Sequence, residues 1–327
     1  MTESAEQSES DTLSEHAIDV VHWMTRRRVT PFLGAGVNLA DRPAGVAYEE
    51  GKWLPNGGEL ARSLADKFKY PFDDKDNLLR VSWYATFKQD QAALYDYLQD
   101  VFAHTFEPGC VHRFLATLPR ELEAHNYPNC YQTIVTTNYD DVLERALEAQ
   151  GEEYDVLYFQ AEGKKAGFFY HVPYKQEPRV IKKPQEYTDL PIDLGTGNTR
   201  TVIVKIHGAL SRVDSESSSF VVTEDDYIDY LARAKMQQPL PKVLEAQLQK
   251  TRFLFMGYSL RDWNMRVFLR RISQARTLRT KSWAIMHETE KLEEYFWQSN
   301  DVTVLKLSLK DYIAKLNAQI ETLPRSE

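Results

Sequence analysis

The stretch Val29-Thr-Pro-Phe-Leu-Gly-Ala-Gly-Val-Asn38 decides the fold class of this chain. Its first half, Val29–Leu33, is a short apolar run that favours a β-strand, and Gly34-Ala35-Gly36 follows at once. A strand that ends in small residues and turns into a helix is typical of a dinucleotide-binding βα unit. The glycine pair lacks the full GxGxxG spacing, so on its own it fits ordinary turn chemistry equally well.

Three more apolar runs stop at small or polar residues in the same way. They are Tyr131–Thr137 before Asn138-Tyr-Asp-Asp141, Thr201–Ile206 before His207-Gly208, and Arg252–Met256 before Gly257-Tyr-Ser259. Helical patterns separate these runs, and two more strands are expected at 282–286 and 302–307. Strands that alternate with helices predict an α/β fold with a Rossmann-like parallel sheet.

The carboxyl ends of parallel strands lie along one edge of a sheet, and ligands bind in the crevice there. The residues that follow each of these runs have an ordinary structural explanation when each is taken alone. Asn138 could cap a helix, His207 could be a structural histidine, and Gly257-Tyr-Ser259 could be a helix entry. We therefore base the prediction of one shared site on the convergence of all four stretches.

The remaining segments are expected to surround this sheet. The polar, acidic residues 1–12 predict a disordered tail, and 14–28 predicts an amphipathic helix. A helical module is expected at about 41–125, with helices near 59–68, 92–106 and 111–122. Residues 13–327 are then expected to form one catalytic domain, with the module as a lid over the site.

Composition limits the class of protein further. The 327 residues carry 40 Lys and Arg against 48 Asp and Glu, a formal net charge of −8, which argues against direct binding of nucleic acid. Hydrophobic residues make up 43% of the chain, enough for a large core. No apolar run approaches the ~20 residues of a membrane span. The two cysteines, Cys110 and Cys130, fit ordinary thiols in a reducing, cytoplasmic setting.

Taken together and in this order, four motifs resemble the sirtuin family, and specifically its bacterial sirtuin-like branch. They are GAGVN (34–38), TTNYDD (136–141), KIHGAL (205–210) and GYSL (257–260). The run HRFLATL (112–118) also resembles a sirtuin helix. The resemblance spans about residues 17–290 and implies a sirtuin fold that binds NAD.

The resemblance also implies a role for individual residues. Asn138 and His207 match the family's catalytic pair, and Asp140 matches the aspartate of the nicotinamide pocket. The other residues expected to bind NAD are Gly34, Ala35, Gly36, Asn38, Gly257, Ser259 and His287, the last by a loose match.

Two departures from the family pattern bear on the reaction. The segment after His207 holds no cysteine, so the zinc ribbon of sirtuin deacylases is missing and no metal is expected. The loop after Gly36 also differs, with Asn38-Leu-Ala-Asp-Arg-Pro-Ala44 in its place. In sirtuin deacylases the ribbon and the loop frame the groove that binds acyl-lysine. Because the ribbon is missing here and the loop is altered, water becomes the natural nucleophile in place of acyl-lysine. The expected activity is hydrolysis of NAD to nicotinamide and ADP-ribose.

The resemblance implies a role in bacterial antiphage defence through NAD depletion. Two alternatives stay open, namely an NAD-dependent deacylase or ADP-ribosyltransferase, and a catalytically silent nucleotide-sensing scaffold. Control is expected to come from self-assembly or from a partner protein, such as a translocase-like ATPase or an Argonaute-type sensor. The basic segment 261–281 could be a docking face or a solvated helix, and 223–227 predicts a capped, acidic helix start rather than a metal site.

Overall fold

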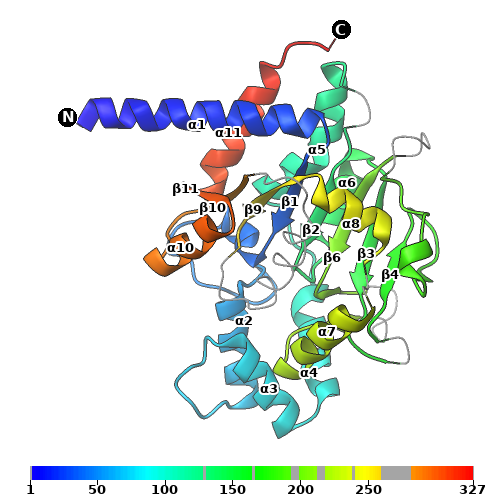
Figure 1. Cartoon of the computed structure of the whole chain (residues 1–327). Coiled ribbons are helices and arrows are strands. Elements are labelled where there is room, and N and C mark those ends of the chain that lie inside the picture. Colours follow the sequence, from blue (N-terminus) through cyan, green and yellow to red (C-terminus); the bar gives the residue numbers. More distant parts are fainter. Residues whose placement is uncertain are drawn as a thin grey trace.

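The fold is shown by a computed structural model of the chain (Figure 1). It describes residues 2–127, 130–163, 166–192, 199–211, 218–237, 240–258 and 281–326. For 2–12 and 231–237 it describes the backbone alone. The expected helix at 263–275, the basic segment 261–280 and Ser259 lie outside the described residues.

The described elements alternate between strands and helices along the chain. The strands are β1 (Val29–Leu33), β2 (Thr133–Thr136), β3 (Tyr154–Phe159), β4 (Phe169–Val172), β5 (Arg179–Val180), β6 (Thr201–Lys205), β7 (Gly208–Ala209), β8 (Ser219–Phe220), β9 (Arg252–Met256), β10 (Ser282–Met286) and β11 (Val302–Lys306). The helices are α1 (Thr2–Thr25), α2 (Gly57–Phe68), α3 (Leu78–Lys88), α4 (Gln91–Ala103), α5 (Cys110–Ala124), α6 (Val142–Gln150), α7 (Glu224–Gln237), α8 (Lys242–Gln249), α10 (Lys291–Ser299) and α11 (Leu309–Glu321), with short 3₁₀ turns η1 (Ala35–Leu39) and η2 (Pro184–Glu186).

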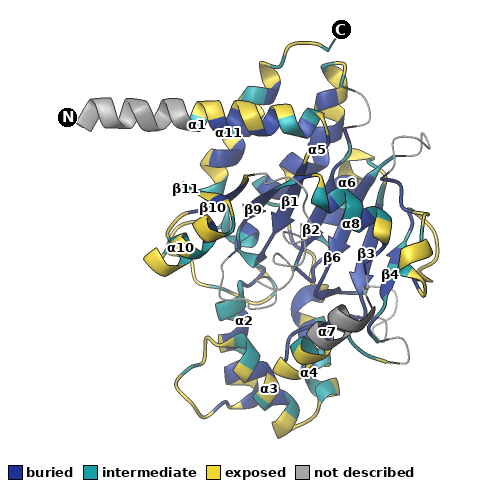
Figure 2. Ribbon diagram, in the orientation of Figure 1, coloured by how far each residue is buried: buried dark blue, intermediate teal, exposed yellow. Residues whose placement is uncertain are grey.

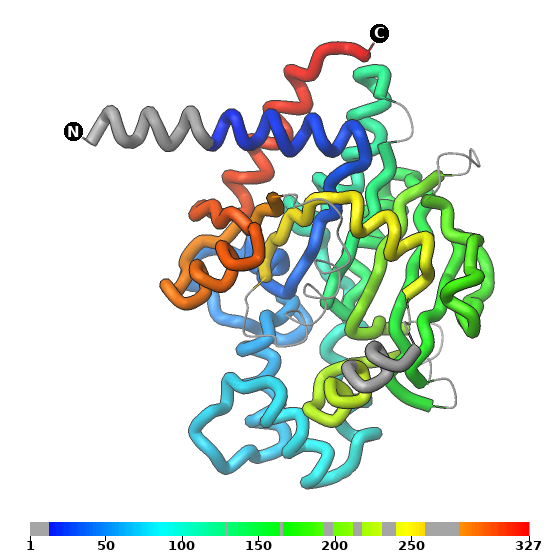
Figure 3. Tube along the Cα trace, in the orientation of Figure 1, coloured from blue at the N-terminus to red at the C-terminus, as the bar shows by residue number. Residues whose placement is uncertain are grey.

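Nine of the described strands form one sheet, in the order β11-β10-β9-β1-β2-β6-β3-β4-β5. The strands from β11 to β3 run parallel, whereas β4 and β5 add an antiparallel edge. Figure 3 shows that β9 lies beside β1. Val29 pairs with Arg252, although more than 200 residues separate the two in the chain. The predicted α/β fold with a Rossmann-like parallel sheet is therefore confirmed.

The central strands are buried along their whole length, as in β1, β2 and β6, which explains why they are mostly apolar rather than alternating (Figure 2). The strands at or next to the edges, β4, β5 and β11, are partly exposed. Within β1, Leu33 faces a core shared with α1, α5, α6 and α11, while Phe32 faces a second core shared with α7, α8 and α10. Neighbouring residues thus serve opposite layers because successive side chains of a strand point to opposite faces.

The helical module consists of α2, α3 and α4, which share a third core that includes Leu64, Val81 and Leu98. This core extends to Tyr139 and Val222, so the module packs against the carboxyl edge of the sheet. The sequence did not predict α3 or α10, and it placed α5 in the module. In the structure α5 covers a face of the sheet together with α1 and α11.

A further difference concerns the amino-terminal helix. Helix α1 begins at Thr2, where the sequence predicted a disordered tail over 1–12 and a helix from Ser14. Its buried side chains, such as Val20 and Met24, pack in the core that also contains Tyr312 of α11. Within the described ranges, none of the helices combines the length and apolar character that a membrane crossing requires.

Candidate active site

A cavity of about 1850 Å³ opens at the carboxyl edge of the parallel strands. The turns after β1, β2, β6, β9 and β10 all contribute to its wall, as the sequence predicted for the first four. The predicted residues among its lining are Gly34, Ala35, Gly36, Asn38, Asn138, Asp140, His207, Gly257 and His287. The module adds Gly58, Arg62 and Asn77 from the opposite side.

The turns after β1 and β9 touch each other through their backbones. The N–H of Gly36 donates to the carbonyl of Gly257 over 2.8 Å. A Cβ atom added to Gly34 or Gly36 would lie 2.5 or 2.7 Å from that same carbonyl oxygen. These glycines are therefore required by the close approach of two turns.

The turn after β2 carries two polar side chains into the wall of the cavity. Asn138 is 9% exposed, and its Nδ2 lies 3.4 Å from the carbonyl oxygen of Gly34, which joins this turn to the one after β1. Asp140 is 5% exposed, and its Oδ1 accepts from the N–H of Val142 at the start of α6. Asp141 instead pairs with Arg145 over 3.3 Å, so Asp140 is the carboxylate that faces the site.

His207 follows β6 directly and is 3% exposed. Its carbonyl accepts from the N–H of Val221, and its ring meets that of Tyr227 edge to face, with centroids 5.5 Å apart. Gly208 next to it has φ +93°, and a Cβ there would lie 2.6 Å from the carbonyl carbon of Ser219. The β7–β8 hairpin thus requires glycine after the histidine and holds the imidazole at the cavity wall.

Three acceptor oxygens in this wall are buried and have no hydrogen-bond partner among the described residues. They are Oδ1 of Asn38, Oδ1 of Asn138 and Oδ2 of Asp140. Buried polar atoms are nearly always satisfied in native proteins, so donors from solvent or from a ligand in the cavity are expected at these oxygens.

The other predicted residues differ in their surroundings. His287 lies after β10 at the rim, with its side chain 77% exposed and 3.9 Å from Glu288. His112, from the sirtuin-like helix, is fully enclosed in α5, and its Nδ1 accepts from the N–H of Gly109. Burial lowers the pKa of His112, and the carboxylate of Asp140 partly opposes that effect.

The sequence analysis missed two buried charges behind the site, Lys205 and Glu144, which form an ion pair of 2.6 Å. The signal was present, because Lys205 is the one charged residue within the apolar run TVIVKI. The expected capping at 223–227 is confirmed, since Thr223 Oγ1 accepts from the N–H of Asp226 and Asp226 Oδ2 accepts from the N–H of Thr223.

No group of three or more potential metal ligands occurs in the part of the chain that the structure describes. The two cysteines lie away from the site. Cys130 is buried, and this burial raises the pKa of its thiol to about 11.

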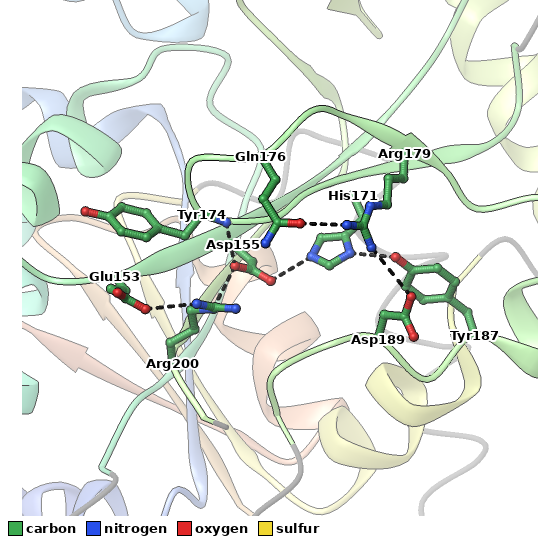
Figure 4. A network of polar contacts seen from close by, with 9 residues as sticks. All are labelled: Glu153, Asp155, His171, Tyr174, Gln176, Arg179, Tyr187, Asp189 and Arg200. Carbon is green, nitrogen blue, oxygen red and sulfur yellow. Dashed lines mark hydrogen bonds and ion pairs between the residues drawn. The ribbon is translucent and has the colours of Figure 1, made fainter. Parts of the chain in front are cut away.

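A second buried polar cluster lies at the amino end of β3, away from the cavity (Figure 4). Asp155 accepts from His171 Nε2 at 2.7 Å and from the N–H of Tyr174, and its Oδ1 lies 2.9 Å from Arg200 Nε. His171 Nδ1 lies 2.6 Å from the hydroxyl of Tyr187, whose pKa burial raises to about 12. This network ties the antiparallel edge of the sheet to β3 and contributes nothing to the cavity wall.

The sheet order, the glycine turns and the polar carboxyl edge define a Rossmann-like α/β protein with a cavity at the sheet edge where such folds bind ligands. A family model described as the SIR2-like domain matches residues 132–305, more than half of the chain. The chain therefore belongs to the SIR2-like family. The matched segment contains Asn138, Asp140 and His207, whereas the Gly34–Gly36 turn precedes it.

Curated proteins also resemble this chain in sequence, at low identity. A protein named NAD(+) hydrolase ThsA from Acinetobacter baumannii is 25% identical over 242 residues, which cover 74% of this chain and 38% of that protein. The ThsA of Bacillus cereus is 24% identical over 248 residues, covering 75% of this chain and 40% of the relative. The chain thus spans about two fifths of the length of these relatives.

Proposed function

We propose that this protein hydrolyses NAD at the bond between nicotinamide and ribose. The observation that carries the proposal is the set of orphaned, buried acceptors on Asn38, Asn138 and Asp140 in a cavity beside His207. NAD offers matching donors in its ribose hydroxyls and its carboxamide. The names of the ThsA relatives, NAD(+) hydrolase, point to the same substrate.

The chemistry of bond breaking suits such a wall. The electron pair of the C1′–N1 bond leaves with the pyridinium, which becomes neutral nicotinamide, so no general acid is needed. The ribose is left as an oxocarbenium ion, which nearby negative or dipolar oxygens stabilise. Asp140 would hold the carboxamide of nicotinamide, and Asn138 would hold a water or a ribose hydroxyl.

Water then completes the reaction by forming a bond from its oxygen to C1′. Its proton passes to a base, and His207 is the buried imidazole at the wall of the cavity. A neutral imidazole can accept this proton as a general base. The products are ADP-ribose, nicotinamide and one proton.

The turns at Gly34–Gly36 and Gly257 are proposed to lie against the pyrophosphate, because they line the cavity at the carboxyl ends of β1 and β9. His287 and Ser259 are proposed contacts on the ribose and adenosine side. No zinc is part of the proposal, since no cysteine follows His207.

The biological role proposed is depletion of NAD in bacterial antiphage defence, which rests on the sirtuin-like resemblance. An active hydrolase of this kind would harm its own cell, so turnover should be low until the chain assembles with itself or with a partner protein. The module α2–α4 packs against the carboxyl edge and is the proposed lid.

The decisive experiment incubates the pure protein with NAD and resolves the products by chromatography, over a range of protein concentrations. Nicotinamide and ADP-ribose in equal amounts support hydrolysis. ADP-ribose attached to the protein in their place would favour the transferase alternative, and an acylated ADP-ribose that forms only when an acyl-lysine peptide is added would favour the deacylase. NAD that binds but stays intact at every concentration would favour a silent sensor.

A further inference from the structure

Lys205 is the last residue of β6 and lies two positions before His207. Its side chain is 2% exposed, and lysine is almost never buried to this degree unless it is paired. Its Nζ lies 2.6 Å from Glu144 Oε1 and donates to the backbone carbonyls of Asp140 and, over 3.4 Å, Tyr139. The three donors of the ammonium group thus have three acceptors.

Two of these acceptors belong to the turn that carries the side chains of Asn138 and Asp140 into the cavity. Neither Lys205 nor Glu144 lines the cavity, so the ammonium group holds this turn from behind the cavity wall. Glu144 lies in the first turn of α6, directly after the same turn of chain. One buried residue thus joins the strand that leads to His207 with the turn that leads to Asn138.

The energetics favour a positional role over a stabilising one. Two buried charges lose their hydration, and an apolar pair of similar volume is often as stable or more stable. Glu144 Oε2 is buried with no hydrogen-bond partner among the described residues, so the desolvation of this carboxylate is not fully compensated. What an apolar pair could not supply is the set of donors to the carbonyls of Tyr139 and Asp140.

We propose that Lys205 is a positioning residue, which fixes the Asn138–Asp140 turn relative to His207, with Glu144 as its counter-ion. The inference rests on the proposed hydrolysis of NAD for its effect on rate. Misplacement of reacting groups by about 1 Å costs on the order of 100-fold in rate, whereas binding through the rest of the cavity is retained. The loss is therefore expected in kcat rather than in KM.

The test compares three variants of the full chain. Glu144→Gln removes one charge but leaves the bonds from Lys205 to the carbonyls. The double variant Lys205→Met with Glu144→Gln removes both charges, so no unpaired ion is left in the core. Lys205→Arg keeps a buried cation with donors. Urea unfolding establishes that each variant is folded before kcat and KM for NAD are measured.

We expect kcat to fall ~100-fold in the double variant and only a few-fold in Glu144→Gln, with KM within a few-fold of wild type in both. Lys205→Arg should recover part of kcat relative to the double variant. A folded double variant with the kcat of wild type would overturn the proposal. So would a Glu144→Gln variant that loses as much kcat as the double variant, because the carbonyl bonds would then be irrelevant.

A second readout separates this inference from the proposed activity. Hydrogen exchange at the amides of Asn138–Val142 needs no substrate and should speed up ~10-fold in the double variant but not in Glu144→Gln. If wild-type protein leaves NAD intact while this difference is observed, the activity is wrong and the positioning role stands. Unchanged exchange in the double variant refutes the positioning role whatever the activity.

Discussion

Substitution of Gly257 by alanine tests how the site is built. Gly257 follows β9 with φ +65°, and an added Cβ would lie 2.5 Å from the carbonyl carbon of Gly36 and closer still to the backbone nitrogen of Val37. Both neighbours are backbone atoms, so no side chain can rotate away. The turn after β9 and the 3₁₀ turn η1 must therefore separate to admit one methyl group.

The magnitude follows from two contributions. A non-glycine residue in the left-handed region costs ~1–2 kcal/mol, and forcing extra volume into a packed site costs ~1–3 kcal/mol. We therefore expect Gly257→Ala to lower the free energy of unfolding by ~2–5 kcal/mol. Gly151→Ala is the matched control, because Gly151 has φ +74° but nothing within 4 Å of its added Cβ. It should cost only the backbone contribution of ~1–2 kcal/mol.

Urea unfolding of both variants, extrapolated linearly to water, measures these losses. NAD turnover is then measured under conditions where both remain folded. Gly257→Ala should lose turnover because η1 carries Asn38 and the proposed pyrophosphate turn, whereas Gly151→Ala should keep it. Equal loss of stability in the two variants, together with wild-type turnover in Gly257→Ala, would refute the close approach as the reason for this glycine.

Three further perturbations have expected outcomes. Asn138→Ala and His207→Ala should each reduce NAD cleavage by ~10²–10⁴-fold without changing the circular dichroism spectrum, and near-wild-type cleavage by both would disprove the assignment. His16 is buried with its Nε2 2.9 Å from the hydroxyl of Tyr312, and burial lowers its pKa from 6.5 to about 4. As the pH falls, the His16 imidazole of the unfolded chain is protonated before that of the folded chain. The free energy of unfolding should therefore fall by up to ~3 kcal/mol between about pH 6.5 and about pH 4. Urea midpoints across this range should show this loss in wild type and a smaller one in His16→Leu. Asp155→Ala should lower the free energy of unfolding by ~3–5 kcal/mol, because His171 and Arg200 lose their buried partner. Since this network does not line the cavity, kcat per folded molecule should stay within about two-fold of wild type. A large fall in kcat would mean that the network does affect the site.

Much of the sheet could be predicted from the sequence because buried parallel strands leave a local record. Runs such as Arg252–Met256 and Ser282–Met286 are apolar after their first residue, and the structure has strands at the same residues. The turn residues that follow these runs were equally informative, since turns at the carboxyl edge of a sheet need small or polar residues. Helix α3 was missed because its pattern, LLRVSWYATFK, exposes Trp83 and Phe87 to solvent and so lacks a clean apolar face.

Other features depend on residues that meet only in three dimensions. The local pattern did not separate Asp140 from Asp141, and only the family resemblance singled out Asp140. In the structure Asp141 pairs with Arg145, and Asp140 lies at the cavity. The role of Lys205 was also hidden, since its carbonyl partners lie more than 60 residues away in the chain.

The sequence by itself determined most of the parallel strands, the side of the sheet on which the polar residues gather, and the family resemblance. Each of these is written in residues close together in the chain, through apolar runs and the turn residues that end them. Only the tertiary structure decided that the glycines after β1 and β9 press against each other, and that a buried ammonium group lies behind Asn138 and Asp140. The reason is physical: such contacts depend on the register of neighbouring strands and on the packing of distant turns, and neither leaves a local pattern of hydrophobicity.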